Sequence, residues 1–164
     1  SRYVNRNTLV DPVNEFRNIW VDELGLCVKW INSGIHHIEA QASWLDSNNP
    51  ISIHLFLRFD NGSSASIIIY TSSQDNQHQR LASSKAEVLD CNVPNQTIRI
   101  GRLNESGHLF FGKQTFDPAQ AAEKAALLFL KSIQLNSETA YSSYDAIQLA
   151  KQIEKVEQRL GLFS

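Results

Sequence analysis

The sequence predicts an α+β fold: an N-terminal helix, an antiparallel meander sheet of about six to seven strands, and two C-terminal helices packed on the sheet. Three observations carry this prediction. The middle of the chain alternates apolar and polar residues, its strands are joined by short turns, and both ends show helical spacing. Strand and helix patterns that are separated along the chain are typical of α+β domains. With 164 residues, we expect a single domain covering residues 1–164.

The first elements are a polar arm and a helix. Residues 1–10 are predicted to be a loose arm or an edge strand. Asp11 and Pro12 then begin a helix at about residues 12–23, because Asp caps free amides and Pro suits the first helical position. Gly25 is the expected stop. The apolar face of this helix repeats at helical spacing, with Val13, Phe16, Ile19 and Trp20.

The stretch that follows this helix is predicted to form strands. Residues 26–31 alternate and predict a strand that ends in a turn at 32–34. In the following strand, around 36–44, one face is apolar and the other is polar. This pattern predicts a sheet with one buried face and one solvent-exposed face. The clearest hairpin is Ile51–Thr71, where Asn61-Gly62 supplies the positive φ of a tight turn.

The second half of the sheet is less regular. Residues 72–84 are almost entirely polar, and we predict a mobile loop there. Shorter strands are expected at 86–91, 97–103 and 108–116. Turn residues separate them, so these strands are also predicted to run antiparallel.

The chain ends in two predicted helices. One begins at Asp117-Pro118 and carries a broad apolar face that we expect to be buried, with Ala122, Ala125, Ala126, Phe129, Leu130 and Ile133. The other begins at Ser142, where Asp145 completes the spacing of a capping box. Its seam steps by three or four residues through Ala146, Leu149, Ile153, Val156, Leu160 and Phe163.

Composition and the absence of known motifs argue against several classes of function. The net charge of −2 argues against a large basic surface for nucleic acid, and no apolar run approaches a membrane span. No G-x-G-x-x-G, phosphate-binding loop or G-x-S-x-G elbow occurs, so no cofactor is predicted. Cys27 and Cys91 lie in predicted strands; we expect buried thiols in a reducing, cytoplasmic compartment, with a disulfide as the alternative. The chain begins at Ser1 and lacks Met, which suggests a fragment of a longer protein.

Two alternatives concern the sheet. His37 and Glu39 share a face, and His54 on the next strand could join them as a metal or hydrolytic site. His36 is expected on the opposite face from His37, because adjacent strand residues alternate. A sheet that binds single-stranded nucleic acid would use stacking and charge together, through Phe56, Tyr70, Arg58 and Arg99.

The favoured function is a non-catalytic protein-interaction or assembly module. We expect it to bind a protein partner or form a homodimer through the C-terminal helix, within residues 136–164. The outer sheet face and the 72–84 stretch are further candidate contacts. The predicted contact on the helix combines its apolar seam with a basic row: Leu149, Ile153, Val156, Leu160, Lys151, Lys155 and Arg159.

Overall fold

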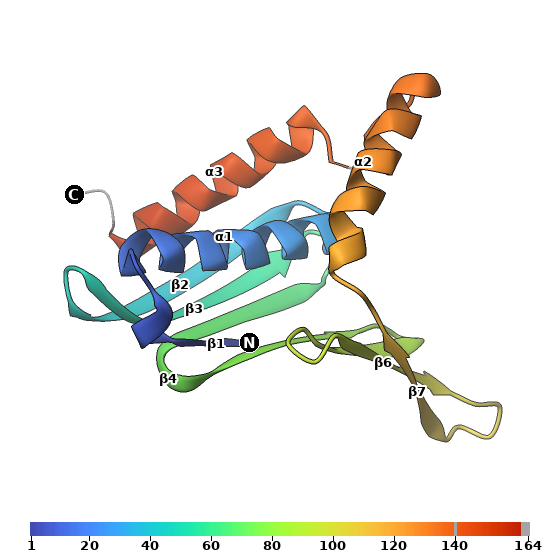
Figure 1. Cartoon of the computed structure of the whole chain (residues 1–164), viewed down its shortest axis with the longest axis horizontal. Coiled ribbons are helices and arrows are strands. Elements are labelled where there is room, and N and C mark those ends of the chain that lie inside the picture. The colour runs from blue at the N-terminus through green and yellow to red at the C-terminus, as the bar shows by residue number, and fades with distance from the viewer. Residues whose placement is uncertain (140, 162–164) are drawn as a thin grey trace. The chain divides into compact units, whose positions relative to one another are not determined.

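The computed structural model describes residues 1–139 and 141–161 and confirms the α+β fold class (Figure 1). Strands and helices follow one another as β1 (Arg2–Asn5), a 3-10 turn (Arg6–Thr8), α1 (Pro12–Ile31), β2 (Ile35–Asp46), β3 (Asn49–Phe59), β4 (Ser64–Ser83), β5 (Glu87–Asn92), β6 (Thr97–Leu103), β7 (Leu109–Thr115), α2 (Ala119–Gln134) and α3 (Ser143–Leu160). None of the described helices is long and apolar enough to cross a membrane.

The chain divides into two compact units. The larger unit comprises Arg2–Asn76 and Tyr141–Ser164, and the smaller unit comprises Ser1 and Gln77–Ala140. Strand β4 runs through both, so the strand order β2-β3-β4-β5-β6-β7 is continuous, with β1 beside β4. The β2–β7 pairs for which the register is defined are antiparallel, as expected for a meander.

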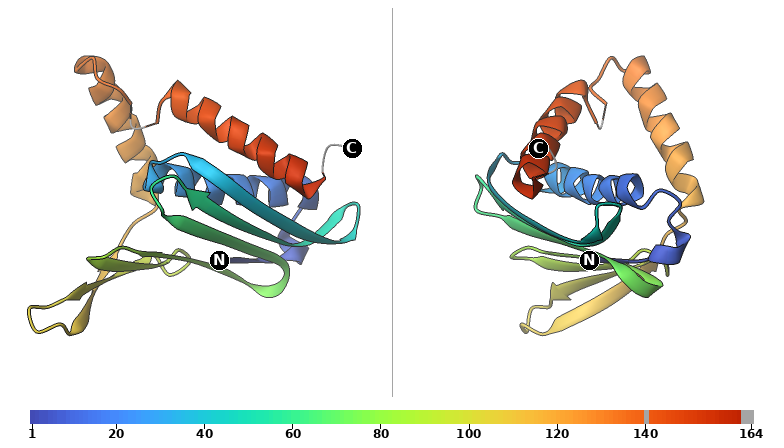
Figure 2. Two further views of the ribbon diagram at one scale, coloured as in Figure 1. Left: turned by 180° about the vertical axis from the view of Figure 1, so that it is seen from behind. Right: turned by 90° about the vertical axis from the view of Figure 1, so that its left-hand side faces the viewer.

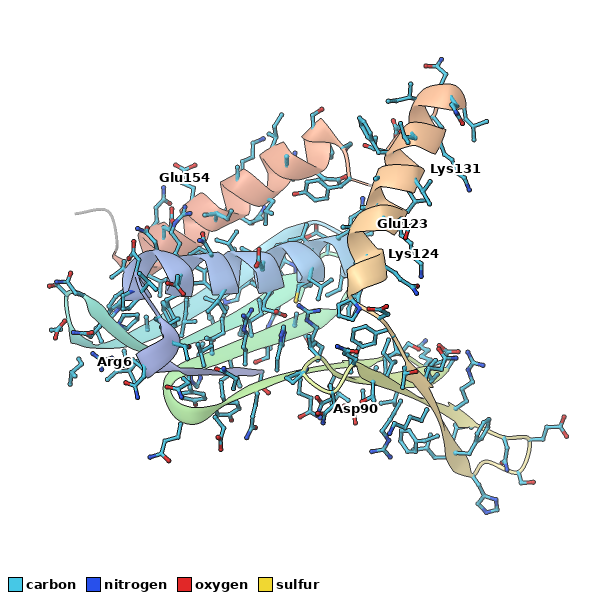
Figure 3. All side chains as sticks on the ribbon, in the orientation of Figure 1. Arg6, Asp90, Glu123, Lys124, Lys131 and Glu154 are labelled. Atoms are coloured by element: carbon cyan, nitrogen blue, oxygen red, sulfur yellow. The ribbon has the colours of Figure 1, made fainter. Side chains whose placement is uncertain are left out.

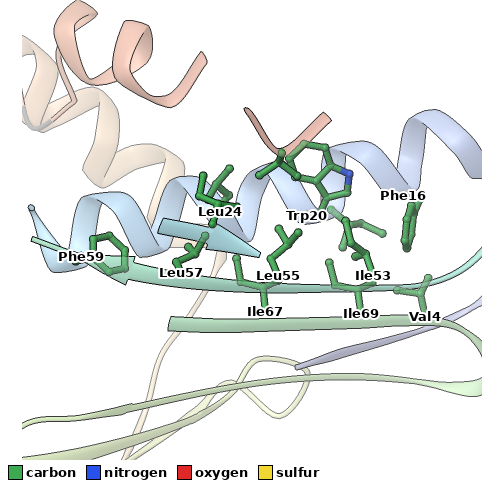
Figure 4. Close-up of a cluster of buried hydrophobic side chains, with 13 residues drawn as sticks. Val4, Phe16, Trp20, Leu24, Ile53, Leu55, Leu57, Phe59, Ile67 and Ile69 are labelled. Carbon is green, nitrogen blue, oxygen red and sulfur yellow. The ribbon is translucent and has the colours of Figure 1, made fainter. Parts of the chain in front are cut away.

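The core lies in the larger unit, between the sheet and two helices. Helix α1 packs on β3, α3 packs on β2, and the two helices contact each other on the same sheet face (Figure 2). Figure 4 shows the apolar side chains of α1 meeting those of β3 and β4. The predicted inward face of the hairpin is confirmed. The buried core comprises Val4, Phe16, Ile19, Trp20, Leu24, Ile38, Ile53, Leu55, Leu57, Phe59, Ile67, Ile69 and Val156.

Helix α1 is longer than the sequence indicates. The strand predicted at 26–31 is wrong, since these residues continue α1, and Cys27 therefore lies in a helix. Gly25 does not stop the helix. The helix ends at Ile31 and is capped by Asn32, whose backbone is left-handed with φ 48°. Gly25 instead allows close approach, because a Cβ there would lie 3.1 Å from Cδ2 of Leu149 on α3.

Strand β4 replaces the loop predicted at 72–84. Its last residues pair with β5 from Gln79↔Asn92 to Ser83↔Val88. The first residues of the chain also lie along it, since β1 pairs with β4, and the Asn5 side chain donates to the carbonyl of Gln74. The polar composition misled the prediction because residues 74–77 are exposed, and an exposed strand carries no alternating apolar signal.

Helix α3 begins as predicted. The Ser142 hydroxyl accepts from the Asp145 amide, and the Asp145 carboxylate accepts from the Ser142 amide, which together form a capping box. Val156 is fully buried, and Leu149, Ile153 and Leu160 pack against the core. Phe163, the last residue of the predicted seam, lies outside the described residues.

The smaller unit contains β5, β6, β7 and α2, and it contributes no described residue to the apolar core. The helix face predicted to be buried is exposed: Phe129 is 55%, Leu130 54% and Ile133 62% exposed. That prediction assumed that an apolar helix face is covered by its own chain. Figure 3 shows Glu123, Lys124 and Lys131 on one side of α2, and helical geometry places Phe129 and Ile133 on another side.

Candidate functional site

The outer face of the sheet in the larger unit carries the predicted metal ligands. His37 Nε2 lies 3.0 Å from Glu39 Oε1, whereas the His54 ring meets Tyr70 edge-on at 5.3 Å between centroids. His54 is opposite Gln41, which places it diagonal to Glu39 at about 7 Å. No group of three metal-binding side chains occurs among the described residues, so the three predicted ligands do not converge.

The residues predicted to bind nucleic acid fall in both units. On β3 of the larger unit, the Arg58 guanidinium lies 5.6 Å from the Phe56 ring centroid, and Tyr70 of β4 stacks on Tyr3 at 5.3 Å. Arg99 belongs to the smaller unit, where it lies over Phe111. Its Nη1 is also 3.8 Å from Asp90 Oδ2, so part of its charge is balanced locally. Nucleic-acid binding stays a prediction.

The apolar seam of α3 is occupied within the larger unit, by α1 and β2. Two ion pairs hold the helix there: Arg17 Nε lies 2.6 Å from Glu157 Oε1, and Lys29 Nζ lies 3.0 Å from Asp145 Oδ2. The basic row Lys151, Lys155 and Arg159 remains on the surface. Binding of a partner protein by this row stays a prediction.

A pocket lies where β2 begins beside the last turns of α3. It has a volume of about 280 Å³ and is lined by Ile35–Ile38, Lys155, Gln158 and Arg159. The pairing register shifts here, since Ile35 is opposite Phe59 and His37 is opposite Arg58, which leaves His36 as an extra residue. A bulge of this kind interrupts the alternation of side chains between the two sheet faces and can change the direction of a side chain. Strict alternation is interrupted between Ile35 and His37, and both histidines line this pocket.

Each pocket histidine also contacts a carboxylate. His36 Nδ1 lies 3.4 Å from Asp60 Oδ1, and His37 Nε2 lies 3.0 Å from Glu39 Oε1. Neither carboxylate lines the pocket, whose described lining contains no acidic residue. The sequence shows both histidines and both cations. It does not show the bulge and the helix–strand contact that bring them together.

Three carboxyl groups have lowered pKa values, and none of them indicates an active site. Hydrogen bonds from Asn14 lower the pKa of Asp11, and hydrogen bonds from Asn49 and Asn48 lower that of Asp46. The backbone amide of Ser142, followed by the Lys29 side chain, lowers the pKa of Asp145. Each group caps a helix or closes a turn, which explains its shift without catalysis.

The smaller unit exposes large apolar side chains on two of its elements. Besides α2, the hairpin of β6 and β7 exposes large apolar side chains, with Phe110 at 52% and Phe111 at 44% exposure. Exposed apolar residues occur on both elements: Leu103, Leu109, Phe110, Phe111, Leu127, Leu128, Phe129, Leu130 and Ile133. We call these nine residues the apolar surface. The sequence shows their apolar character but not their exposure.

Comparison with known proteins identifies the fold. No model of a known protein family and no curated protein matches the sequence. Solved structures do match, and the fold resembles part of several dehydrogenases and of a Gal80p mutant. The chain spans about half the length of the solved structures that it matches.

Three structures illustrate the likeness. A UDP-N-acetylglucosamine 3-dehydrogenase from Acidithiobacillus ferrooxidans has a TM-score of 0.79 at 11% identity, with 99% of this chain and 53% of that chain covered. A dehydrogenase from Clostridium difficile has a TM-score of 0.70 at 16% identity, with 97% and 52% covered. A super-repressor mutant of Gal80p from Saccharomyces cerevisiae has a TM-score of 0.67 at 9% identity, with 89% and 47% covered. At these identities the likeness concerns the fold alone.

Proposed function

We propose that this chain is a non-catalytic assembly module that joins a second copy of itself through the apolar surface of the smaller unit. One observation carries the proposal: the smaller unit holds abundant large apolar side chains, and its described residues bury none of them in a core. Exposed large apolar side chains that gather on one part of a protein often mark interaction sites. Burial against another chain would remove this surface from water.

The chemistry of the surface supports a protein partner. Phe110, Phe111 and Phe129 are aromatic, and aromatic side chains are enriched at the centres of protein interfaces. Lys124 and Lys131 lie on the same side of α2 as Glu123 (Figure 3). A second copy is the proposed occupant because the same apolar patch on two subunits can be self-complementary about a two-fold axis.

The fold comparison supports a related proposal about the whole protein. The similar solved structures include named dehydrogenases and a biliverdin reductase with NADP+ from Synechocystis. This chain covers about half of each, and it contains no G-x-G-x-x-G motif. We propose that it supplies the half of an oxidoreductase-like assembly that does not hold the nucleotide. Titration with NADPH should then give no saturable fluorescence change, and one-to-one binding would contradict this.

Association is tested by analytical ultracentrifugation over a wide range of protein concentration. The chain should sediment as a dimer or larger assembly, and Phe129→Glu should shift it toward monomer, because burying an unpaired carboxylate is costly. The matched control is Leu45→Glu, which makes the same kind of change at a 66% exposed apolar residue of the larger unit. A monomeric parent chain at all concentrations would refute the proposal, as would equal effects of the two variants.

A further inference from the structure

The pocket between the start of β2 and the end of α3 has the composition of an anion site. We propose that it binds a small phosphate-bearing anion, held by Lys155 and Arg159 on the helix and by His36 and His37 on the strand. The inference is independent of the assembly role, since every pocket residue belongs to the larger unit.

The positive charge of the pocket is concentrated and only partly balanced. Lys155 and Arg159 are four residues apart and therefore neighbours on one face of α3, where like charges repel and cost a little helix stability. Neither forms an ion pair with a described residue. An anion between them would replace this repulsion with attraction, and Arg presents a planar fork that suits phosphate oxygens.

His36 and His37 line the opposite wall of the pocket. Asp60 engages Nδ1 of His36, and Glu39 engages Nε2 of His37, so in each ring the other nitrogen remains available to a ligand. Gln158 also lines the pocket and contributes an amide group.

The size of the pocket sets the ligand class. A volume of about 280 Å³ lies near the lower end of small-molecule sites, which begin at roughly 300 Å³. A phosphate monoester with a short organic group fits this volume, and Ile35 and Ile38 would contact its apolar part. Basic residues in the last turn of a helix also complement the helix dipole. That effect explains Arg159, but it does not explain the pocket beside the strand bulge.

The test follows histidine and backbone NMR resonances during titration with inorganic phosphate at constant ionic strength. We expect saturable shifts at His36, His37 and the last two turns of α3. Arg159→Gln and Lys155→Gln should each weaken phosphate binding about tenfold, the usual scale for loss of a charge-assisted hydrogen bond. Lys151→Gln is the matched control, because it removes the same charge from the same helix outside the pocket.

Several outcomes would overturn the proposal. One is the absence of saturable shifts, and another is equal weakening by Lys151→Gln and Lys155→Gln, which would indicate diffuse electrostatic attraction. Binding of succinate in a parallel titration without binding of phosphate would overturn the assignment to a phosphate. Thermal unfolding of each variant confirms folding, and a variant that fails to fold is replaced by Arg159→Lys, which should retain partial phosphate binding.

Discussion

At the scale of residues, local chemistry is well predicted where it depends on near neighbours. The Ser142–Asp145 capping box and the inward residues of the hairpin were predictable because their spacing determines their geometry. His36 and His37 show the limit. Strict alternation separates them, and only a bulge at Ile35–His37 brings both into one pocket. The sequence has no clear signal for that extra residue.

Asp145 should make the stability of the protein depend on pH. Its folded pKa is lowered, chiefly by the Ser142 amide, so its stabilising contribution is present above the unfolded pKa near 4 and disappears as pH falls through the folded pKa. Asp145→Asn should therefore lower the urea midpoint at pH 7, with a smaller difference from the parent chain at pH 3. An equal difference at both pH values would contradict this account.

At the scale of elements, two boundaries depended on contacts that the sequence does not display. Gly25 resembles a residue that ends a helix, yet α1 continues past it. The glycine instead leaves room for Leu149 of α3. β4 continues through a polar stretch because strand neighbours, rather than apolar alternation, hold it. Elements with one buried face, such as β2 and β3, were predictable because burial leaves a period of two.

Gly25 is predicted to be a packing residue. Gly25→Val should destabilise the protein by about 1–3 kcal/mol, because the added side chain overpacks the contact with Leu149. Gly112→Val is the control, since a Cβ at Gly112 meets no atom within 4 Å and Val suits a strand. Urea unfolding of both variants checks this prediction. Equal stability of Gly25→Val and the parent chain would show that α1 and α3 are not in close contact.

At the scale of the whole molecule, the chain concentrates its core in one unit and leaves apolar side chains exposed in the other. The fold class was predictable, because separate runs of strand and helix patterns indicate α+β. The uneven core was not predictable, because the apolar face of α2 has the same pattern whether its own chain or another covers it. The assembly proposal follows from that asymmetry.

Hydrogen–deuterium exchange at several protein concentrations tests this proposal most directly. Peptides from β6, β7 and α2 should exchange more slowly as concentration rises, because association would bury the apolar surface and reduce local opening. Peptides from α1 and β3, which form the core of the larger unit, should be unaffected. Exchange that is independent of concentration in both units would contradict self-assembly through the smaller unit.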